Sequence, residues 1–292
     1  MKLPDFEYSA PSTPAEVVKL LASRPGEAKV ISGGQSLLPT MAFRLAQPSL
    51  LVDLRNLQGL NRITIDDSGV LLGARTRWRD IEDEAKLMTA HPLLVKAISH
   101  VAHYQVRNRG TVGGSLAHAD PASEMPCIAA TCEAELRLLS PRGERRVKAS
   151  EFFLGPLTTA LADDEIIIEV RLPPWLHERR WAFGEFARRP GDFALAGVAL
   201  FYDLDASQRA CNAHIGGVGA CYYSKRLPLA EHALNGRRVN AETAASVAKI
   251  ASEEADATGD FHASVEYRKA LVGTLLERAL VEAAGRTPGS SH

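Results

Sequence analysis

The sequence predicts an α+β protein of two domains, with a boundary near residue 175. Before the Pro173-Pro174 pair, helix patterns are mixed with short apolar strand patterns and hairpins. After it, three consecutive strand segments are followed by two helices, an order typical of a separate α+β unit. With 292 residues, 46% of them hydrophobic, the chain can bury a sizeable core without disulfide or metal support.

The first helix has a clear start signal. Thr13 can accept hydrogen bonds from free amide groups, Pro14 suits the first helical position, and Glu16 can reach back to the cap. Apolar residues at 17, 18, 20 and 21 give this helix one buried face, and Gly26 is a plausible stop. A short apolar strand, 29–32, follows and is broken by Gly33-Gly34.

The other elements follow from periodicity and turn residues. Before the boundary we expect strands at 50–54 and 165–172, hairpins at 62–74 and 134–149, helices at 79–88, 92–102 and 124–132, and a loop over 107–120. The hairpins turn at Asp67-Ser68-Gly69 and at Pro141-Arg142-Gly143. After the boundary we expect strands 181–187, 194–205 and 209–217, helices 241–255 and about 262–284, and a disordered tail, 287–292.

Composition limits the classes of function. Lys plus Arg number 34 and Asp plus Glu 35, so no basic field favours nucleic acid or anionic lipid. Cys127, Cys132, Cys211 and Cys221 form no C-x-x-C pair, so ligands for a zinc ribbon or an iron–sulfur cluster are missing from this chain. Neither a signal peptide nor an apolar stretch of about 20 residues is evident. We therefore expect a cytoplasmic protein without a membrane span.

Two glycine-rich turns are the candidate binding elements. Residues 32–37, Ser-Gly-Gly-Gln-Ser-Leu, directly follow a buried strand, and residues 110–115, Gly-Thr-Val-Gly-Gly-Ser, follow a basic stretch. Paired glycines let backbone N–H groups point into one concavity, which binds phosphate oxygens, and hydroxyl side chains add donors. Two such turns could hold a pyrophosphate from both sides, so the pattern favours a dinucleotide. The alternative is that each Gly-Gly is merely a turn.

Other motifs compete weakly. G-x-G-x-x-G and the phosphate-loop motif are absent, and Gly216-Gly217-Val218-Gly219 reads as a strand end. His100 and His103 could share a helical face but have no third metal ligand at useful spacing. His118 lies in the stretch after the second turn, where a ligand would sit. Asp120 and Glu124 follow it and could accept from ribose hydroxyls or cap and begin the next helix.

At these turns the sequence resembles a known family. Residues 32–37 resemble the loop A-G-G-[HQ]-S-L, and residues 111–126 closely resemble T-[IV]-G-G-[SN]-x-x-x-[AG]-[DS]-P-x-[SA]-[DE]-x-P. Both mark the FAD-binding medium subunits of carbon monoxide dehydrogenases and the flavin domain of xanthine dehydrogenases. Further matches at 152–156, 165–173 and 187–194 extend the resemblance to about residue 285.

The resemblance implies a two-part FAD-binding domain of the p-cresol methylhydroxylase type at 1–175, with subdomains of about 1–55 and 56–175, followed by a C-terminal α+β domain at 176–286. It implies an FAD site formed by Ser32, Gly33, Gly34, Gln35, Ser36, Leu37, Val101, Val106, Gly110, Thr111, Gly113, Gly114, Ser115, His118, Glu124, Leu161 and Phe193. One departure is Glu185, which stands where a Lys is common in the family.

The same resemblance implies the activity, that of an oxidoreductase. A large subunit with a molybdenum cofactor oxidises the substrate, and a small subunit passes electrons through [2Fe-2S] clusters to the FAD of this chain. The flavin then reduces NAD, a quinone or oxygen, and a dimer of heterotrimers is implied. The flavin does the redox chemistry itself, so this chain needs no catalytic acid or nucleophile.

Two alternatives stay open at this point. The chain could be a self-contained FAD-dependent oxidoreductase of the same fold, which would need its own substrate base. It could also be a non-catalytic assembly module that has lost FAD, although both glycine turns are intact.

Overall fold

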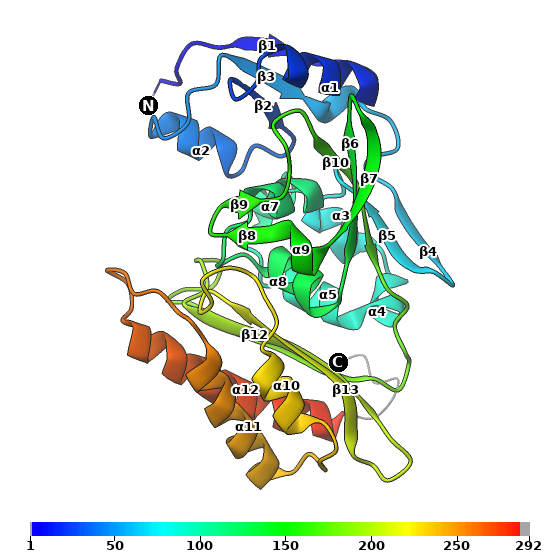
Figure 1. Ribbon diagram of the computed structural model, residues 1–292, viewed down its shortest axis with the longest axis vertical. Coiled ribbons are helices and arrows are strands. Elements are labelled where there is room, and N and C mark those ends of the chain that lie inside the picture. The colour runs from blue at the N-terminus through cyan, green and yellow to red at the C-terminus, as the bar shows by residue number, and fades with distance from the viewer. Residues whose placement is uncertain (1, 287–292) are drawn as a thin grey trace.

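The N-terminal unit is a small parallel sheet with its helices. The computed structural model describes residues 2–286, and Figure 1 shows this unit at one end of the molecule. Its strands β1 (Glu7–Ser9), β3 (Leu50–Asp53) and β2 (Ala28–Ile31) lie in that order and pair in parallel. Helices α1 (Pro14–Ser23) and α2 (Leu37–Ala42) complete the unit. As predicted, α1 begins with a capping box between Thr13 and Glu16.

The second unit is built on a five-stranded antiparallel sheet in the order β4-β5-β10-β6-β7. Both predicted hairpins are confirmed, as β4 (Ile63–Asp66) with β5 (Gly69–Gly73) and β6 (Glu135–Ser140) with β7 (Gly143–Lys148). The central strand β10 (Ile166–Leu172) joins two cores. Ile166 and Ile168 pack with the N-terminal unit, while Ile167 and Val170 pack with the second unit. Alternation separates residues 166 to 168, and the register shift between Ile167 and Glu169 brings Val170 to the face of Ile167.

Helices cover one side of this sheet, and here three predictions were wrong. The helix expected at 79–88 is divided into α3 (Trp78–Asp83) and α4 (Leu87–Ala90) because Glu84 takes an extended conformation. Helix α5 (Pro92–Ile98) ends before residue 102, and Ala102 has a φ of 40°. His100 and His103 therefore share no helical face. The loop expected at 107–120 is largely helix α7 (Val112–His118).

The remaining elements of the second unit are short, apart from α8. They are η1 (Leu54–Asn56), α6 (Tyr104–Arg107), α8 (Glu124–Thr131), α9 (Ala149–Phe152), β8 (Phe153–Gly155) and β9 (Thr158–Thr159). Every residue of α8 is buried, because this helix packs between the second unit and the sheet of the C-terminal unit (Figure 1). The sequence of α8, which reads Glu-Met-Pro-Cys-Ile-Ala-Ala-Thr, is correspondingly apolar on all sides.

The C-terminal unit has the predicted three antiparallel strands, β11 (Arg180–Phe186), β12 (Ala196–Leu204) and β13 (Ala210–Val218). Helices α11 (Ala241–Glu254) and α12 (Val265–Gly285) were expected, whereas α10 (Pro228–Leu234) was not. The α+β fold class is thus confirmed. None of the described helices is long and apolar enough to cross a membrane. The predicted disorder of 287–292 concerns residues outside those described.

The sheet of the C-terminal unit is buried on both faces. Phe183, Phe201 and Val218 point into the core of the second unit. The alternate residues, such as Ala182 and Leu200, point toward the three helices and form a separate core with them. The main hydrophobic core of the molecule therefore crosses residue 175, and the C-terminal sheet is a shared layer.

The connection between β10 and β11 carries a polar contact within this shared layer. The Arg179 guanidinium donates to both carboxylate oxygens of Asp203, at 2.9 and 3.1 Å. It also lies over the rings of Trp175 and Phe201, at 5.0 and 4.2 Å from their centroids. Only 10% of the Arg179 side chain and 19% of the Asp203 side chain is exposed. The pair is thus largely shielded from solvent.

Arg179→Ala is expected to lower the free energy of unfolding by about 3 kcal/mol, since it leaves the Asp203 carboxylate poorly hydrated and without its cation. Chemical denaturation of the purified chain measures this loss. The exposed Arg62 provides the control, and Arg62→Ala should change the stability by less than about 0.5 kcal/mol. Equal stability of the two variants would contradict the structural role given to Arg179.

Candidate cofactor site

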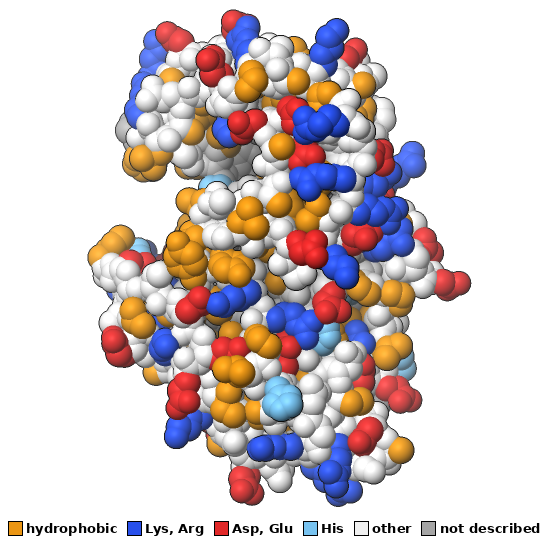
Figure 2. Space-filling view, in the orientation of Figure 1, with side chains coloured by type: hydrophobic (Ala, Val, Ile, Leu, Met, Phe, Trp, Pro, Cys, Tyr) orange, Lys and Arg blue, Asp and Glu red, His pale blue; other side chains and the backbone are white. Residues whose placement is uncertain are grey.

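A large cavity opens between the N-terminal unit and the second unit. Its volume is about 810 Å³, within the range of cofactor pockets, and Figure 2 shows the molecule hollowed between these two units. All the candidate site residues line this one cavity. They are Ser32, Gly33, Gly34, Gln35, Ser36, Leu37, Val101, Val106, Gly110, Thr111, Gly113, Gly114, Ser115, His118, Glu124, Leu161 and Phe193.

The first glycine turn follows β2 and offers free amide groups to the cavity. Gly34 has a φ of 74°, which turns the chain sharply and suits glycine. Among the described residues, the N–H groups of Gly34, Gln35 and Ser36 have no protein acceptor. Adjacent amides that are left without a partner in a concave turn are the donors that an anionic group requires.

This turn is pressed against the chain that leads into the second turn. A Cβ atom on Gly33 would lie only 2.1 Å from the carbonyl oxygen of Arg109, so only glycine allows the two backbones to meet. The hydroxyls of Ser32 and Thr111 are also 3.2 Å apart and hydrogen bonded. Two segments that are far apart in the sequence are therefore fixed side by side at the floor of the cavity.

The second turn differs from the prediction. It is the start of α7, and its amide groups already have partners. The N–H groups of Val112 and Gly113 donate to Thr76 O and Ala74 O, at 2.9 and 2.8 Å, and that of Gly114 donates to Thr111 Oγ1 at 3.3 Å. The expectation that backbone amides of this turn point freely at a phosphate was therefore wrong.

The glycines of the second turn serve close packing instead. A Cβ atom on Gly113 would lie 2.7 Å from Ala74 Cβ, and one on Gly110 would lie 2.6 Å from Trp78 Nε1. Val112, Gly113 and Leu116 are buried, while the opposite side of α7 contributes Gly114, Ser115, Ala117 and His118 to the cavity. The second turn therefore presents side chains and the Cα of Gly114 to a ligand.

The far wall of the cavity is apolar and includes the C-terminal unit. Val101 and Leu161 line it, together with Phe193, whose side chain is 71% exposed. The loop that carries Phe193 touches the second unit, because the Cβ position of Gly191 is 3.0 Å from Ala102 O. All three units therefore contribute to the lining.

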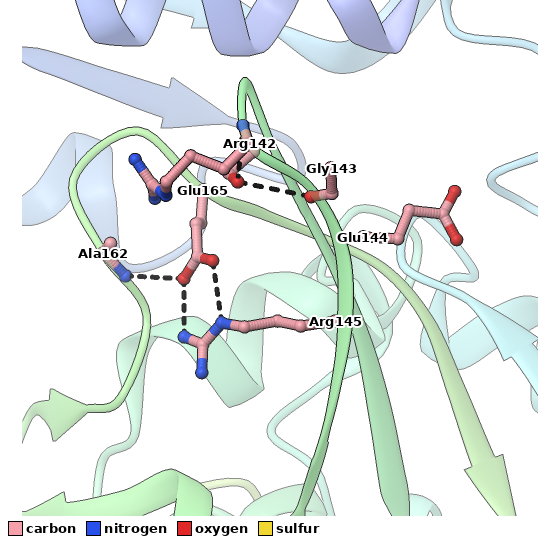
Figure 3. Close-up of a pocket in the computed structure, with 7 residues that line it drawn as sticks. Arg142, Gly143, Glu144, Arg145, Ala162 and Glu165 are labelled. Atoms are coloured by element: carbon pink, nitrogen blue, oxygen red, sulfur yellow. Dashed lines mark hydrogen bonds and ion pairs between the residues drawn. The ribbon is translucent and has the colours of Figure 1, made fainter.

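An ion pair between the partly exposed Arg145 and the buried Glu165 supports the loop that carries Leu161. Figure 3 shows Glu165 accepting from Arg145 and from the amide of Ala162, at distances of 2.7 to 3.0 Å. The Arg145 guanidinium holds the pKa of the Glu165 carboxyl below its usual value. A smaller pocket of about 330 Å³ lies here and shares Ala162 and Glu165 with the main cavity. The Glu165 carboxylate that lines this smaller pocket is already paired with Arg145, so we assign the pocket a supporting role.

Glu124 is the one acidic candidate in the lining, and it is only 8% exposed. Burial, together with the nearby Asp120 carboxylate, raises the pKa of Glu124 to about 7. The alternative role, in which Asp120 caps the helix that follows, is not realised as expected. Ser123 stands at the N-cap of α8 without a side-chain bond, and Asp120 accepts from Ala122 N at 2.9 Å. Glu124 opens the helix as predicted, with its carboxyl free of any side-chain partner in the described structure.

Sequence reasoning missed several lining residues, notably Lys29, Trp78, Thr159 and Asp163. None belongs to a glycine-rich motif, and the fold brings each one to the cavity from a different element. Trp78 begins α3 and packs against Gly110, which is distant in the sequence, so no local pattern marked it.

The fold and the site together define a protein that binds a large anionic cofactor between two subdomains. The unpaired amides of the first turn, the hydroxyl of Ser115 and the apolar far wall fit the pyrophosphate and the ring systems of FAD. The comparisons identify the family. Residues 4–175 match the FAD binding domain in molybdopterin dehydrogenase, and residues 181–283 match the CO dehydrogenase flavoprotein C-terminal domain.

Individual relatives are similar to this chain over nearly its whole length. The nicotine 6-hydroxylase medium subunit of Paenarthrobacter nicotinovorans is 40% identical, covering 98% of this chain and 100% of that protein. The carbon monoxide dehydrogenase medium chain of Hydrogenophaga pseudoflava is 33% identical, covering 97% and 98%. Among solved structures, quinoline 2-oxidoreductase from Pseudomonas putida 86 matches with a TM-score of 0.92 at 38% identity, covering 97% of this chain and 98% of that one.

The chain therefore belongs to the FAD-binding medium subunits of the carbon monoxide dehydrogenase and xanthine dehydrogenase family. It is the oxidoreductase flavoprotein subunit of a multi-subunit molybdenum hydroxylase.

Gly114→Val is expected to weaken FAD retention at least about tenfold, equivalent to about 1.4 kcal/mol. The Cβ atom would lie 2.8 Å from Thr111 Oγ1, and the branched side chain would fill space that the cofactor needs. Flavin released from the purified protein by denaturation gives the content. Gly285→Val is the control, because a side chain there meets nothing within 4 Å. Normal flavin content in Gly114→Val would place the cofactor elsewhere.

Proposed function

We propose that this chain takes electrons from [2Fe-2S] clusters of a small partner subunit and passes them through FAD to an external acceptor such as NAD, a quinone or oxygen. The substrate is oxidised in a large partner subunit that carries the molybdenum cofactor, and the complex is a cytoplasmic dimer of heterotrimers. The proposal rests on one observation above all. Every residue that the family resemblance assigns to FAD lines a single cavity, in a chain as long as its medium-chain relatives.

We assign the residues of the cavity as follows. The free amides of Gly34, Gln35 and Ser36 bind the pyrophosphate. The hydroxyl of Ser115 adds a donor from the opposite side, whereas the Thr111 hydroxyl already donates to Ser32. Gly114 leaves space for the cofactor, whereas Gly33 permits the close contact with the Arg109 backbone. This division between amides and hydroxyls follows from which N–H groups are unpaired in the two turns.

The apolar residues have a different task. Val101, Val106, Leu161 and Phe193 provide surfaces against which flat rings pack and from which water is excluded. Bound FAD supplies the redox chemistry, and the protein holds, orients and electrostatically tunes it. Exposure of Phe193 at the mouth of the cavity leaves this end accessible to an electron donor or acceptor.

Co-purification tests the assembly. The tagged chain, isolated from its native cells, should bring with it one iron–sulfur chain and one molybdenum chain, with FAD, iron and molybdenum measurable in the same fraction. The same isolation with Gly114→Val should keep iron and molybdenum and lose flavin, because the substitution lies inside the cavity.

Two results would contradict the proposal. A yellow protein that purifies alone and oxidises its own substrate would favour a self-contained oxidoreductase. A complex that contains partner chains but no flavin in the unmodified protein would favour an assembly module.

A further inference from the structure

Two acidic side chains from different units lie at and behind the wall of the cavity, close enough for the charge of one to act on the other. Glu124 opens α8 and lines the cavity. Glu185 lies on β11, opposite Gly197 of β12. Phe183, two residues earlier on β11, points into the core of the second unit. Because side chains alternate along a strand, Glu185 points to the same side, toward α8.

Neither carboxyl has a cation. Within residues 2–286, no Lys, Arg or His forms an ion pair with Glu124 or Glu185. Glu185 Oε2 is buried and has no hydrogen-bond partner. A buried carboxylate without a cation or donors is costly, so the arrangement favours the protonated form of at least one of the two.

The electrostatics agree with this geometry. Burial, and then the charge of Glu124, raises the pKa of Glu185 to about 8. The pKa of Glu124 is about 7, for the reasons given above. Because the charge of Glu124 acts on Glu185, the two carboxyls are treated as a coupled pair.

Among the described residues, the other titratable groups around the pair form no ion pair with it. They are Asp120 before α8, Cys127 on α8, Cys221 after β13, His100 against Phe183, and His118 on α7. Burial raises the pKa of the Cys127 thiol to about 12, and burial lowers the pKa of His100, so both are neutral. Arg268, on the neighbouring α12, is engaged by Leu195 O, Gly219 O and Asp260.

We propose that Glu124 and Glu185 form a proton-holding pair at the wall of the FAD cavity, in which Glu124 lines the cavity and Glu185, behind it, is a positioning residue that shares the proton. This inference rests on the proposed function, since it requires FAD in this cavity. A neutral Glu124 presents an O–H donor and no charge to an anionic cofactor. Loss of the shared proton would place negative charge beside FAD.

The consequence is a link between FAD affinity and pH. FAD carries a negative pyrophosphate, so its binding favours the protonated pair, and protons are taken up on binding at a pH near 8. Affinity should therefore fall as the pH rises through the range in which the pair ionises. At most one proton per carboxyl is involved, which limits the fall to about tenfold per pH unit per proton.

The test is calorimetric titration of FAD into the flavin-stripped complex between pH 6 and pH 9, in buffers of different ionisation enthalpy. We expect affinity to fall about tenfold or more over this range, with proton uptake near pH 8. Glu185→Gln and Glu124→Gln should each reduce both effects, and the double variant should remove them. Glu178→Gln, at an exposed position, should behave like the unmodified protein.

Infrared difference spectra of the FAD-loaded complex give a second readout that does not need the cofactor removed. A protonated carboxyl band present at pH 7 should be weakened in Glu185→Gln and in Glu124→Gln, and lost in the double variant. Retention of the full band in the double variant, or a pH dependence that survives in the double variant and disappears in His118→Gln, would overturn the inference. Failure of the complex to bind any FAD would instead refute the proposed function.

Discussion

The cavity depends on a contact between two backbones. Residues 33 and 109 approach so closely that no side chain fits between them, and the hydroxyls of Ser32 and Thr111 fasten the contact across a separation of 79 residues. The N-terminal unit is also joined to the second unit through Ile166 and Ile168 of β10 and Leu139 of β6. A shift of this contact would part the amide groups of one wall from the hydroxyls of the other.

The two glycine turns look alike in the sequence but have different physical roles. In the first, the unpaired N–H groups face the cavity and glycine permits the turn. In the second, carbonyls of the neighbouring chain and the Thr111 hydroxyl already accept those hydrogen bonds, and glycine permits packing on Ala74 and Trp78. A helix start needs its amides satisfied, and here the protein itself satisfies them.

Much of the fold could be predicted from local signals. The capping residues around Thr13, the turn at Asp67-Ser68-Gly69 and the β-branched run at 166–168 each specify their element within a few residues. The start of α7 could not be recognised, because Gly-Gly disfavours a helix on propensity and only tertiary contacts hold it there. Long motifs revealed a continuous part of the cavity lining, whereas Lys29 and Trp78 come to it through strand order and helix packing, which no local pattern records.

The shared sheet limits how the chain can be divided. Phe183, Phe201 and Val218 complete the core of the second unit, so a fragment ending at residue 175 would present a broad apolar face to water. Such a fragment would be prone to aggregate, even though the sequence reads as two modules. Chimeras of two relatives should therefore fold only when the strands β11–β13, with their helices, come from the same parent as the core of the second unit that these strands cover.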